Sequence, residues 1–327
     1  MTRDHDQTRP DPNLGMELVR ATEAAAIRAA QHVGRGDKNA ADGAAVDAMR
    51  SYLGTVRFDG LVVIGEGEKD HAPMLYNGER VGDGTGSRYD IAVDPIDGTS
   101  LAAAGRPGAL SVLAVSERGT MFDPSSTFYM RKIVAGAEAR GVIDIREPVT
   151  DNIRELARAK GKKVADVCVA VLDRPRHEEL IDEIRHSGAS TRLLLDGDVA
   201  GAIDAASDDS RVDLCIGIGG TPEGVIAATA VKALGGVMQT VLHPLDDGER
   251  AAVSRTGQTA ATVLSEDDLV RSDDAVFVAT GVTNGDLLRG VDLSPRRIKT
   301  ESIVLRARSG TLRRIRSEHL ASRWGLP

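Results

Sequence analysis

The sequence "YDIAVDPIDGTSLAA", residues 89–103, ends an apolar, strand-like run in two closely spaced carboxylates. Asp94 stands where the run ends, and Asp97 follows three residues later. Between them, Pro95 fixes the direction of the chain, so that the second carboxylate can return to the same site. Gly98 then allows the backbone to approach a ligand closely. The stretch predicts a ligand site at the end of a buried strand.

Two hydroxyl residues, Thr99 and Ser100, come directly after this glycine. They open a predicted short helix, whose exposed N–H groups favour an anion. A metal site beside a hydroxyl is suited to hydrolysis of a phosphate ester, because the metal activates a water and the hydroxyl orients its attack. The stretch therefore predicts phosphate chemistry.

Acidic residues also lie at the ends of three further apolar segments. Each one alone is more simply interpreted as a turn residue or a helix cap. Together they would repel one another unless a cation lay among them, and Mg²⁺ and Mn²⁺ take oxygen ligands of this kind. The predicted acidic group consists of Asp42, Glu66, Glu68, Asp94, Asp97 and Glu223.

The remaining pattern is typical of an α/β protein. Two amphipathic helices, at 14–33 and 41–53, precede a buried strand at 58–65, and strands alternate with helices beyond residue 150. A hairpin is predicted to turn at 309–310. Helix caps are expected at Asn13, Asn152 and Thr221, the last followed by Pro222 in the first turn.

Composition excludes several classes of function. The 327 residues include 41 Lys and Arg against 49 Asp and Glu, and a net charge of −8 argues against nucleic-acid binding. The N-terminus lacks the apolar core of a signal peptide, and no apolar run approaches the roughly 20 residues of a membrane helix. Cys168 and Cys215 lie in apolar runs, where buried reduced thiols are expected. We predict a cytoplasmic protein without a membrane segment.

The motif "DPIDGTS" resembles the D-P-[IL]-[DE]-G-[ST] signature of the metal-dependent, lithium-sensitive sugar phosphatase superfamily. Further segments are similar to bacterial class II fructose-1,6-bisphosphatases over about residues 15–320: "GRGDKNAADGAAVDAMR", "VVIGEGEKDHAPMLY", "DGDVAGAI", "GIGGTPEGV" and "FVATGVTNGDLLRGV". The resemblance implies a layered α-β-α-β-α sandwich with mixed sheets and an active site between two subdomains. It also implies hydrolysis of the 1-phosphate of fructose 1,6-bisphosphate, a step of gluconeogenesis.

The resemblance further implies a role for individual residues. Thr99 would orient the nucleophilic water, and Asp42 and Glu68 are further catalytic candidates. The ligands of Mg²⁺ or Mn²⁺ would be Asp42, Glu66, Asp94, Asp97 and Glu223. The candidates for binding the sugar bisphosphate are Lys38, Ser100, Tyr129, Arg174, Arg176, Asp196, Asp198 and Gly220. Arginine forks suit a phosphate and aspartates suit sugar hydroxyls. Without the resemblance, Asp196 and Asp198 would be read as helix-capping residues and Arg176 as a surface residue.

The pattern along the chain predicts the domain boundaries, and the resemblance implies the role of each subdomain and the oligomeric state. We expect a disordered tail at 1–13, a metal-binding catalytic subdomain at 14–150, and a sugar-phosphate-binding α/β subdomain with the C-terminal hairpin at 151–327. A homodimer or homotetramer is also expected.

The sequence departs from the family in two places near the substrate. Pro107 and Gly108 replace an expected asparagine neighbourhood, and Arg174 stands where lysine is common. Neither position is a proposed metal ligand, so the departures affect substrate fit rather than hydrolysis. A sedoheptulose-1,7-bisphosphatase or another sugar-phosphate phosphatase is therefore an alternative. A non-catalytic sugar-phosphate sensor is less favoured, because the acidic residues and Thr99 are all retained.

Overall fold

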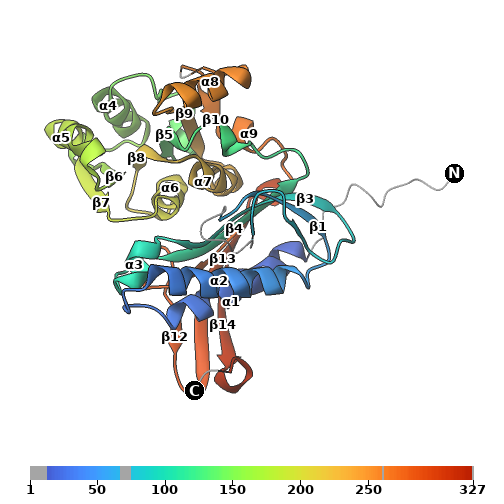
Figure 1. The fold of residues 1–327 in the computed structure, drawn as a ribbon. Coiled ribbons are helices and arrows are strands. Elements are labelled where there is room, and N and C mark those ends of the chain that lie inside the picture. The colour runs from blue at the N-terminus through green and yellow to red at the C-terminus, as the bar shows by residue number, and fades with distance from the viewer. Residues whose placement is uncertain (1–12, 67–74, 260, 326–327) are drawn as a thin grey trace. The chain divides into compact units, whose positions relative to one another are not determined.

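The computed structural model describes residues 13–66, 75–259 and 261–325 (Figure 1). The chain divides into two compact units, each with its own sheet and core. The first unit comprises Met1–Met121, Ser272–Arg308 and Leu312–Pro327, and the second Phe122–Arg271 and Ser309–Thr311. The boundary expected near residue 150 falls inside the second unit. The sequence also gave no sign that the chain returns to the first unit at Ser272.

The first unit contains an eight-stranded mixed sheet with the order β12-β13-β11-β4-β3-β1-β2, in which β14 pairs with β13. Strands β1 and β3 run parallel, whereas β3 with β4 and β4 with β11 are antiparallel. The strands are β1 (Asp59–Ile64), β2 (Arg80–Val81), β3 (Arg88–Asp97), β4 (Leu110–Glu117), β11 (Ala275–Gly281), β12 (Asp292–Leu293), β13 (Arg297–Arg306) and β14 (Thr311–Leu320).

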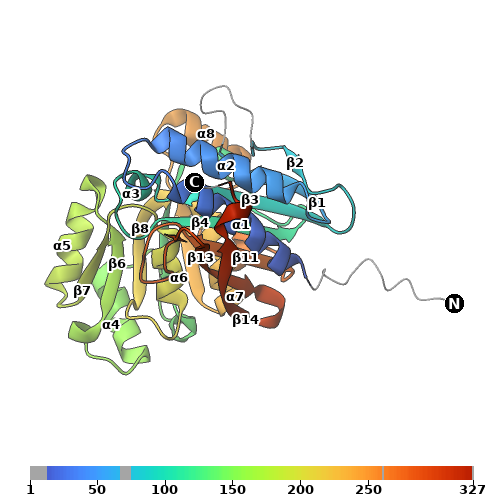
Figure 2. The ribbon, with the colours of Figure 1, turned by 90° about the horizontal axis from the view of Figure 1, so that it is seen from below.

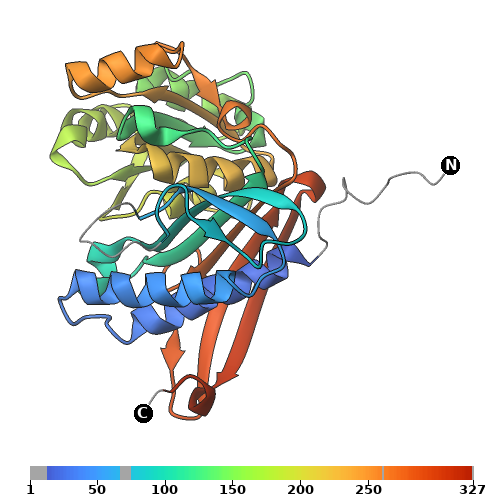
Figure 3. The ribbon, with the colours of Figure 1, turned by 45° about the vertical axis from the view of Figure 1, so that its right-hand side comes forward.

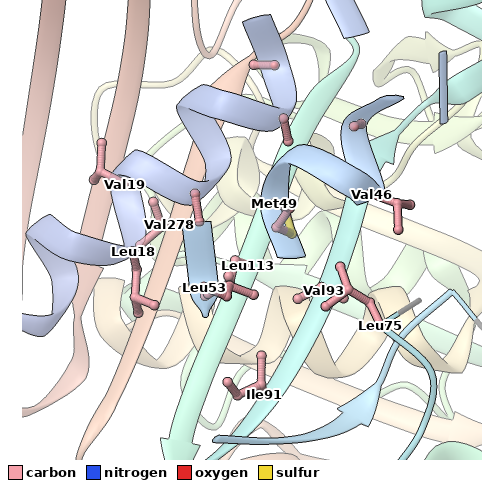
Figure 4. Packing of buried hydrophobic residues seen from close by; sticks show 14 of the residues in the cluster. Leu18, Val19, Val46, Met49, Leu53, Leu75, Ile91, Val93, Leu113 and Val278 are labelled. Carbon is pink, nitrogen blue, oxygen red and sulfur yellow. The ribbon is translucent and has the colours of Figure 1, made fainter. Parts of the chain in front are cut away.

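Two long helices, α1 (Leu14–Ala30) and α2 (Lys38–Leu53), lie side by side on one face of this sheet (Figure 2 and Figure 3). Their apolar faces meet alternate residues of the strands. Leu18 and Met49 belong to the same buried cluster as Val93 and Leu113 (Figure 4). Because apolar area removed from water stabilises the fold by roughly 25 cal/mol per Å², this cluster anchors the strand that carries Asp94.

The second unit is built on a six-stranded mixed sheet with the order β10-β9-β5-β8-β6-β7. Its strands are β5 (Tyr129–Ala135), β6 (Cys168–Leu172), β7 (Ser190–Leu194), β8 (Leu214–Gly220), β9 (Val237–Leu242) and β10 (Leu264–Ser265). Its helices are α4 (Val149–Ala159), α5 (Glu178–His186), α6 (Val199–Ala206), α7 (Thr221–Leu234), α8 (Asp247–Arg255) and α9 (Glu266–Leu269). Helix α3 (Thr99–Ala103) belongs to the first unit.

Helices cover both faces of the second sheet. Ile133 on β5 lies in one buried cluster with Ile153 of α4 and Ile181 of α5. Helices α6 and α7 contact β5 and β8, and Figure 1 shows them on the other side of the strands. Single turns of 3₁₀ helix lie in this unit at Pro124–Ser126, Ala137–Ala139, Val164–Asp166 and Pro175–His177. Two more lie at Ala307–Ser309, between β13 and β14, and at Ala321–Arg323, after β14.

The mixed α/β fold confirms the predicted fold class, but two predicted helix caps are wrong. Asn152 lies inside α4, where its buried side chain accepts from the Asp144 N–H and donates to the Asp144 carbonyl. Thr221 is the first residue of α7, and Gly220 occupies the cap position. The residues around Asn152 gave no hint that the loop at Asp144 would fold back onto it.

The two cysteines are both unpaired, Cys215 buried and Cys168 half-buried. Burial raises the pKa of the Cys215 thiol to about 12, so this group is inert at neutral pH. The described part of the chain contains no helix long and apolar enough to cross a membrane.

Candidate functional site

The end of β3 carries a β-bulge between the two carboxylates of the opening motif. Asp94 pairs with Val112 on β4 and Asp97 pairs with Leu110, so three steps along β3 match two steps along β4. Residues two apart in a strand point to the same face, and paired residues share a face. The bulge therefore brings Asp94 and Asp97, which a regular strand would place on opposite faces, to one face.

The turn after the bulge depends on Gly98. Its φ of 84° and ψ of 41° are left-handed, and a Cβ at this position would lie 3.1 Å from Leu101 Cδ1. The Asp94 carboxylate accepts from the Ile96 N–H at 3.1 Å. The Thr99 hydroxyl donates to the Ile96 carbonyl at 2.9 Å. Because the hydroxyl proton is donated to Ile96, the Thr99 oxygen can accept a hydrogen bond from a water.

Helix α2 presents two predicted site residues near this turn. Lys38, its first residue, donates from Nζ to the Ser100 hydroxyl at 2.7 Å. Asp37 caps the helix by accepting from the Ala40 N–H at 2.9 Å, which fixes the helix start. Asp42 lies one turn beyond Lys38 and thus on the same side of the helix. The structure thereby brings the predicted Lys38 and Ser100 together.

The parallel pairing of β1 and β3 places Glu66 at the same edge of the sheet. Ile64 pairs with Ala92. Two residues further along these parallel strands come Glu66, just beyond the end of β1, and Asp94 on β3. Glu68 lies outside the described residues. Within those described residues, no group of three or more His, Cys, Asp or Glu side chains is arranged to hold a metal ion. The metal assignment therefore stays a prediction.

In the second unit, the predicted sugar-phosphate residues follow the ends of β6 and β7. Arg174 donates to the Asp196 carboxylate at 2.7 Å and to the Leu195 carbonyl at 2.6 Å. Arg176 donates from Nε and Nη2 to the Ile218 carbonyl at 3.1 and 2.9 Å. Its guanidinium carbon lies 5.3 Å from the centre of the Tyr129 ring, a cation–π contact. Four predicted residues thus form two pairs, Arg174 with Asp196 and Arg176 with Tyr129.

His177 is a structural residue that the sequence did not single out. Its Nδ1 lies 2.8 Å from the Leu172 carbonyl, and its Nε2 accepts from the Ile218 N–H at 2.8 Å. The ring is therefore neutral and donates from Nδ1. Burial lowers the pKa of His177, and Arg176 acts in the same direction. The ring holds the loop that carries both arginines against β8.

Asp198 occupies the N-cap position of α6, but its side chain makes no capping hydrogen bond. Its Oδ2 instead lies 2.7 Å from Nζ of Lys132, and both side chains are buried. Glu223 stands in the first turn of α7, with its carboxylate over Gly220. Among the described residues, its buried Oε2 has no hydrogen-bond partner. Burial raises the pKa of Glu223. The sequence did not anticipate Lys132.

Carboxylates at strand ends, a hydroxyl acceptor and arginine side chains are residue types that a phosphoric monoester hydrolase uses. The family model described as bacterial fructose-1,6-bisphosphatase, glpX-encoded, matches residues 12–319. The chain belongs to this family.

Curated relatives resemble nearly the whole chain. The Haemophilus influenzae protein named fructose-1,6-bisphosphatase class 2 is 46% identical over 319 residues, which cover 94% of this chain and 96% of the relative. The Escherichia coli K12 protein named fructose-1,6-bisphosphatase 1 class 2 is 44% identical over 323 residues, 95% and 96% of the two chains. A solved structure of an extragenic suppressor from Pyrococcus furiosus aligns with a TM-score of 0.29 and 18% identity over 59% of this chain and 68% of that chain. That likeness carries no argument.

Proposed function

We propose that this protein hydrolyses the 1-phosphate of fructose 1,6-bisphosphate to give fructose 6-phosphate and phosphate, a reaction of gluconeogenesis. The observation that carries the proposal is the 46% identity, over nearly the whole length, to a relative named for this activity. The bulge that aligns Asp94 with Asp97 supports it, because two carboxylates on one face suit a metal-assisted hydrolysis.

The donor set fits a hard divalent cation, and we propose Mg²⁺ or Mn²⁺. Glu223 has a buried oxygen without a hydrogen-bond partner in the described structure, which a metal would satisfy. The residues that would hold the metal are Asp42, Glu66, Asp94, Asp97 and Glu223. When bound, the ion would activate water and neutralise phosphate charge.

The residues around Asp94 supply orientation and charge. Thr99, whose proton goes to the Ile96 carbonyl, would accept a hydrogen bond from the attacking water and orient it. Lys38 and Ser100 would bind the phosphate that leaves, Lys38 as a cation and Ser100 as a donor. Asp42 and Glu68 are the further catalytic candidates, as proton acceptors for the water.

The second unit would bind the rest of the substrate. The carbonyl of Ile218 fixes the plane of Arg176, and Arg174 is fixed by Asp196, so both forks are pre-organised for the phosphate that is not hydrolysed. Tyr129 and Gly220 face each other across β5 and β8 and would line the sugar. Asp196 and Asp198 would accept from sugar hydroxyls.

Sedoheptulose 1,7-bisphosphate is a second candidate substrate, favoured by the unusual turn after α3. Gly108 has a φ of 107° and donates from its N–H to the Asn284 carbonyl at 2.9 Å. Ala109 donates to the Thr283 hydroxyl at 2.9 Å. These hydrogen bonds fix the turn at Gly108 and Ala109. A rigid turn near Ser100 could determine which sugar bisphosphate the protein prefers. A non-catalytic sensor is the less favoured alternative.

Phosphate release tests the proposal. Purified protein with Mg²⁺ or Mn²⁺ is expected to release phosphate from fructose 1,6-bisphosphate with a higher kcat/KM than from sedoheptulose 1,7-bisphosphate. The reverse preference would reassign the substrate, and release from neither would support the sensor. Unpaired Cys168 and Cys215 fit a reducing compartment, and we propose a cytoplasmic homodimer or homotetramer, which fractionation and sedimentation would check.

A further inference from the structure

Lys132 is a buried lysine in the middle of the second sheet. It lies on β5 and pairs with Gly217 of β8 on one side and Thr240 of β9 on the other. Its side chain is 2% exposed. Strand alternation places it on the same face as Met130 and Val134, opposite Ile133. This is the face that α6 and α7 cover, so the ammonium is directed at the starts of those helices.

The starts of α6 and α7 carry two carboxylates that attract this ammonium, Asp198 and Glu223. Asp198 Oδ2 lies 2.7 Å from Lys132 Nζ. A Cβ at Gly219 would lie 2.1 Å from Asp198 Oδ2 and 2.9 Å from Lys132 Nζ, and one at Gly220 would lie 1.8 Å from Glu223 Oε2. Consecutive glycines therefore leave the space in which the lysine and both carboxylates fit.

The charges of Asp198 and Glu223 explain why a lysine occupies an apolar strand. Burial acts to lower the pKa of Lys132, but attraction to Asp198, with a contribution from Glu223, outweighs it and raises the pKa. The group therefore stays an ammonium. Two buried carboxylates without this cation would repel each other, and each would be costly to keep charged.

The ion pair as a whole is not needed for stability, because replacing a buried ion pair by apolar residues of similar volume is often neutral. Loss of Lys132 alone would be costly, since it would leave Asp198 buried without its cation. What an apolar residue could not do is hold the Asp198 oxygen in place beside α6. A fixed position of the Asp198 carboxylate oxygen is useful only if Asp198 binds another group, such as a hydroxyl of the substrate.

We propose that Lys132 is a positioning residue, whose ammonium fixes Asp198 for contact with the sugar and keeps Glu223 available to a metal ion. The inference rests on the roles given to Asp198 and Glu223 under the proposed function. Lys132 itself touches neither substrate nor metal in this scheme.

The experiment compares Lys132→Met with Lys162→Met in the full-length protein. Lys162 lies in the same unit and pairs with the buried Asp213 at 2.6 Å, and Lys160 remains 3.0 Å from Asp213 when Lys162 is lost. For each variant we would measure KM and kcat on fructose 1,6-bisphosphate, Mn²⁺ binding by calorimetry without substrate, and Tm.

For Lys132→Met we expect KM to rise roughly ten- to hundredfold, because Asp198 loses its buried charged partner, and Mn²⁺ binding to weaken. Lys162→Met should leave both unchanged. Wild-type KM and Mn²⁺ affinity in a folded Lys132→Met protein would overturn the proposal. The measurement of Mn²⁺ binding distinguishes a failure of this proposal from a failure of the proposed function. It needs no substrate, so it gives a result whether or not the wild type hydrolyses the sugar bisphosphate.

If Lys132→Met does not fold, the double variant Lys132→Met/Asp198→Asn removes both members of the ion pair and is compared with Asp198→Asn alone. The proposal expects the two proteins to have the same KM, because the lysine acts on the sugar through Asp198. A further large rise in KM in the double variant would contradict it.

Discussion

Asp94 and Asp97 lie on the same face of β3 although they are three positions apart, because two residues of β3 lie between them and only one residue of β4 lies between their partners Val112 and Leu110. A regular strand would direct one carboxylate to each face. The register of β3 therefore gives the two carboxylates of a short acidic motif a common direction.

The Asp94→Asn variant should lose activity and keep its fold. Asn offers the same oxygen to the Ile96 N–H that Asp94 contacts at 3.1 Å, so Tm should change little. The lost charge should lower kcat by about a hundredfold or more. Steady-state kinetics with saturating Mg²⁺ and a thermal melt check both parts. An Asp94→Asn protein with wild-type kcat would remove Asp94 from the metal site.

Gly98→Ala should affect both stability and activity. A non-glycine residue at φ 84° should cost roughly 1–2 kcal/mol, and the new Cβ would press on Leu101 and displace Thr99. The matched control is Gly84→Ala, where φ is 77° but nothing lies within 4 Å of the added Cβ. Chemical denaturation should show a similar loss for both variants, with kcat reduced only in Gly98→Ala. Equal kcat in both would mean that the turn does not position the site.

Thr99→Val tests the water-orienting hydroxyl. Valine has the same shape, so KM should change little, while kcat should fall by about ten- to a hundredfold because the acceptor is lost. Thr99→Ser keeps the oxygen that bonds to Ile96 and should retain most of kcat. If Val and Ser variants behave alike, the hydroxyl has no role in the chemical step.

Metal binding should stabilise the protein in a concentration-dependent way. An ion that binds only the folded state adds about 2.7 kcal/mol at a hundredfold excess over its Kd, so Tm should rise as Mn²⁺ is added to chelator-treated protein. Glu223→Gln should reduce the rise. A Tm that does not depend on Mn²⁺ or Mg²⁺ would contradict the metal assignment.

His177 should make stability depend on pH. Burial lowers the pKa of its ring in the folded state, so the unfolded chain binds a proton first as pH falls. The stabilisation is fully present above the unfolded pKa of about 6.5 and is lost as pH falls below it. Urea unfolding at pH 7.5 and 5.5 should show a smaller difference in His177→Asn than in the wild type. An equal difference would assign the pH dependence to other groups.

The sequence predicted which acidic residues lie at the ends of elements better than it predicted the residues that pack against them. Asp94, Asp97 and Glu223 each follow an apolar run, so their positions at element ends could be foreseen. The role of Lys132 could not be foreseen. A single lysine in a strand carries no sequence pattern of its own, and its partner Asp198 lies far along the chain. The return of the chain to the first unit at Ser272 was hidden for the same reason: it depends on the pairing of β11 with β4, a contact between distant segments.

The central claim is tested most directly by phosphate release from fructose 1,6-bisphosphate, with fructose 6-phosphate identified as the sugar product. The purified wild-type protein should form both products in equal amounts, with Mg²⁺ or Mn²⁺ present, and should not do so after Asp94→Asn. A folded, metal-loaded wild-type protein that forms neither product would contradict the assignment.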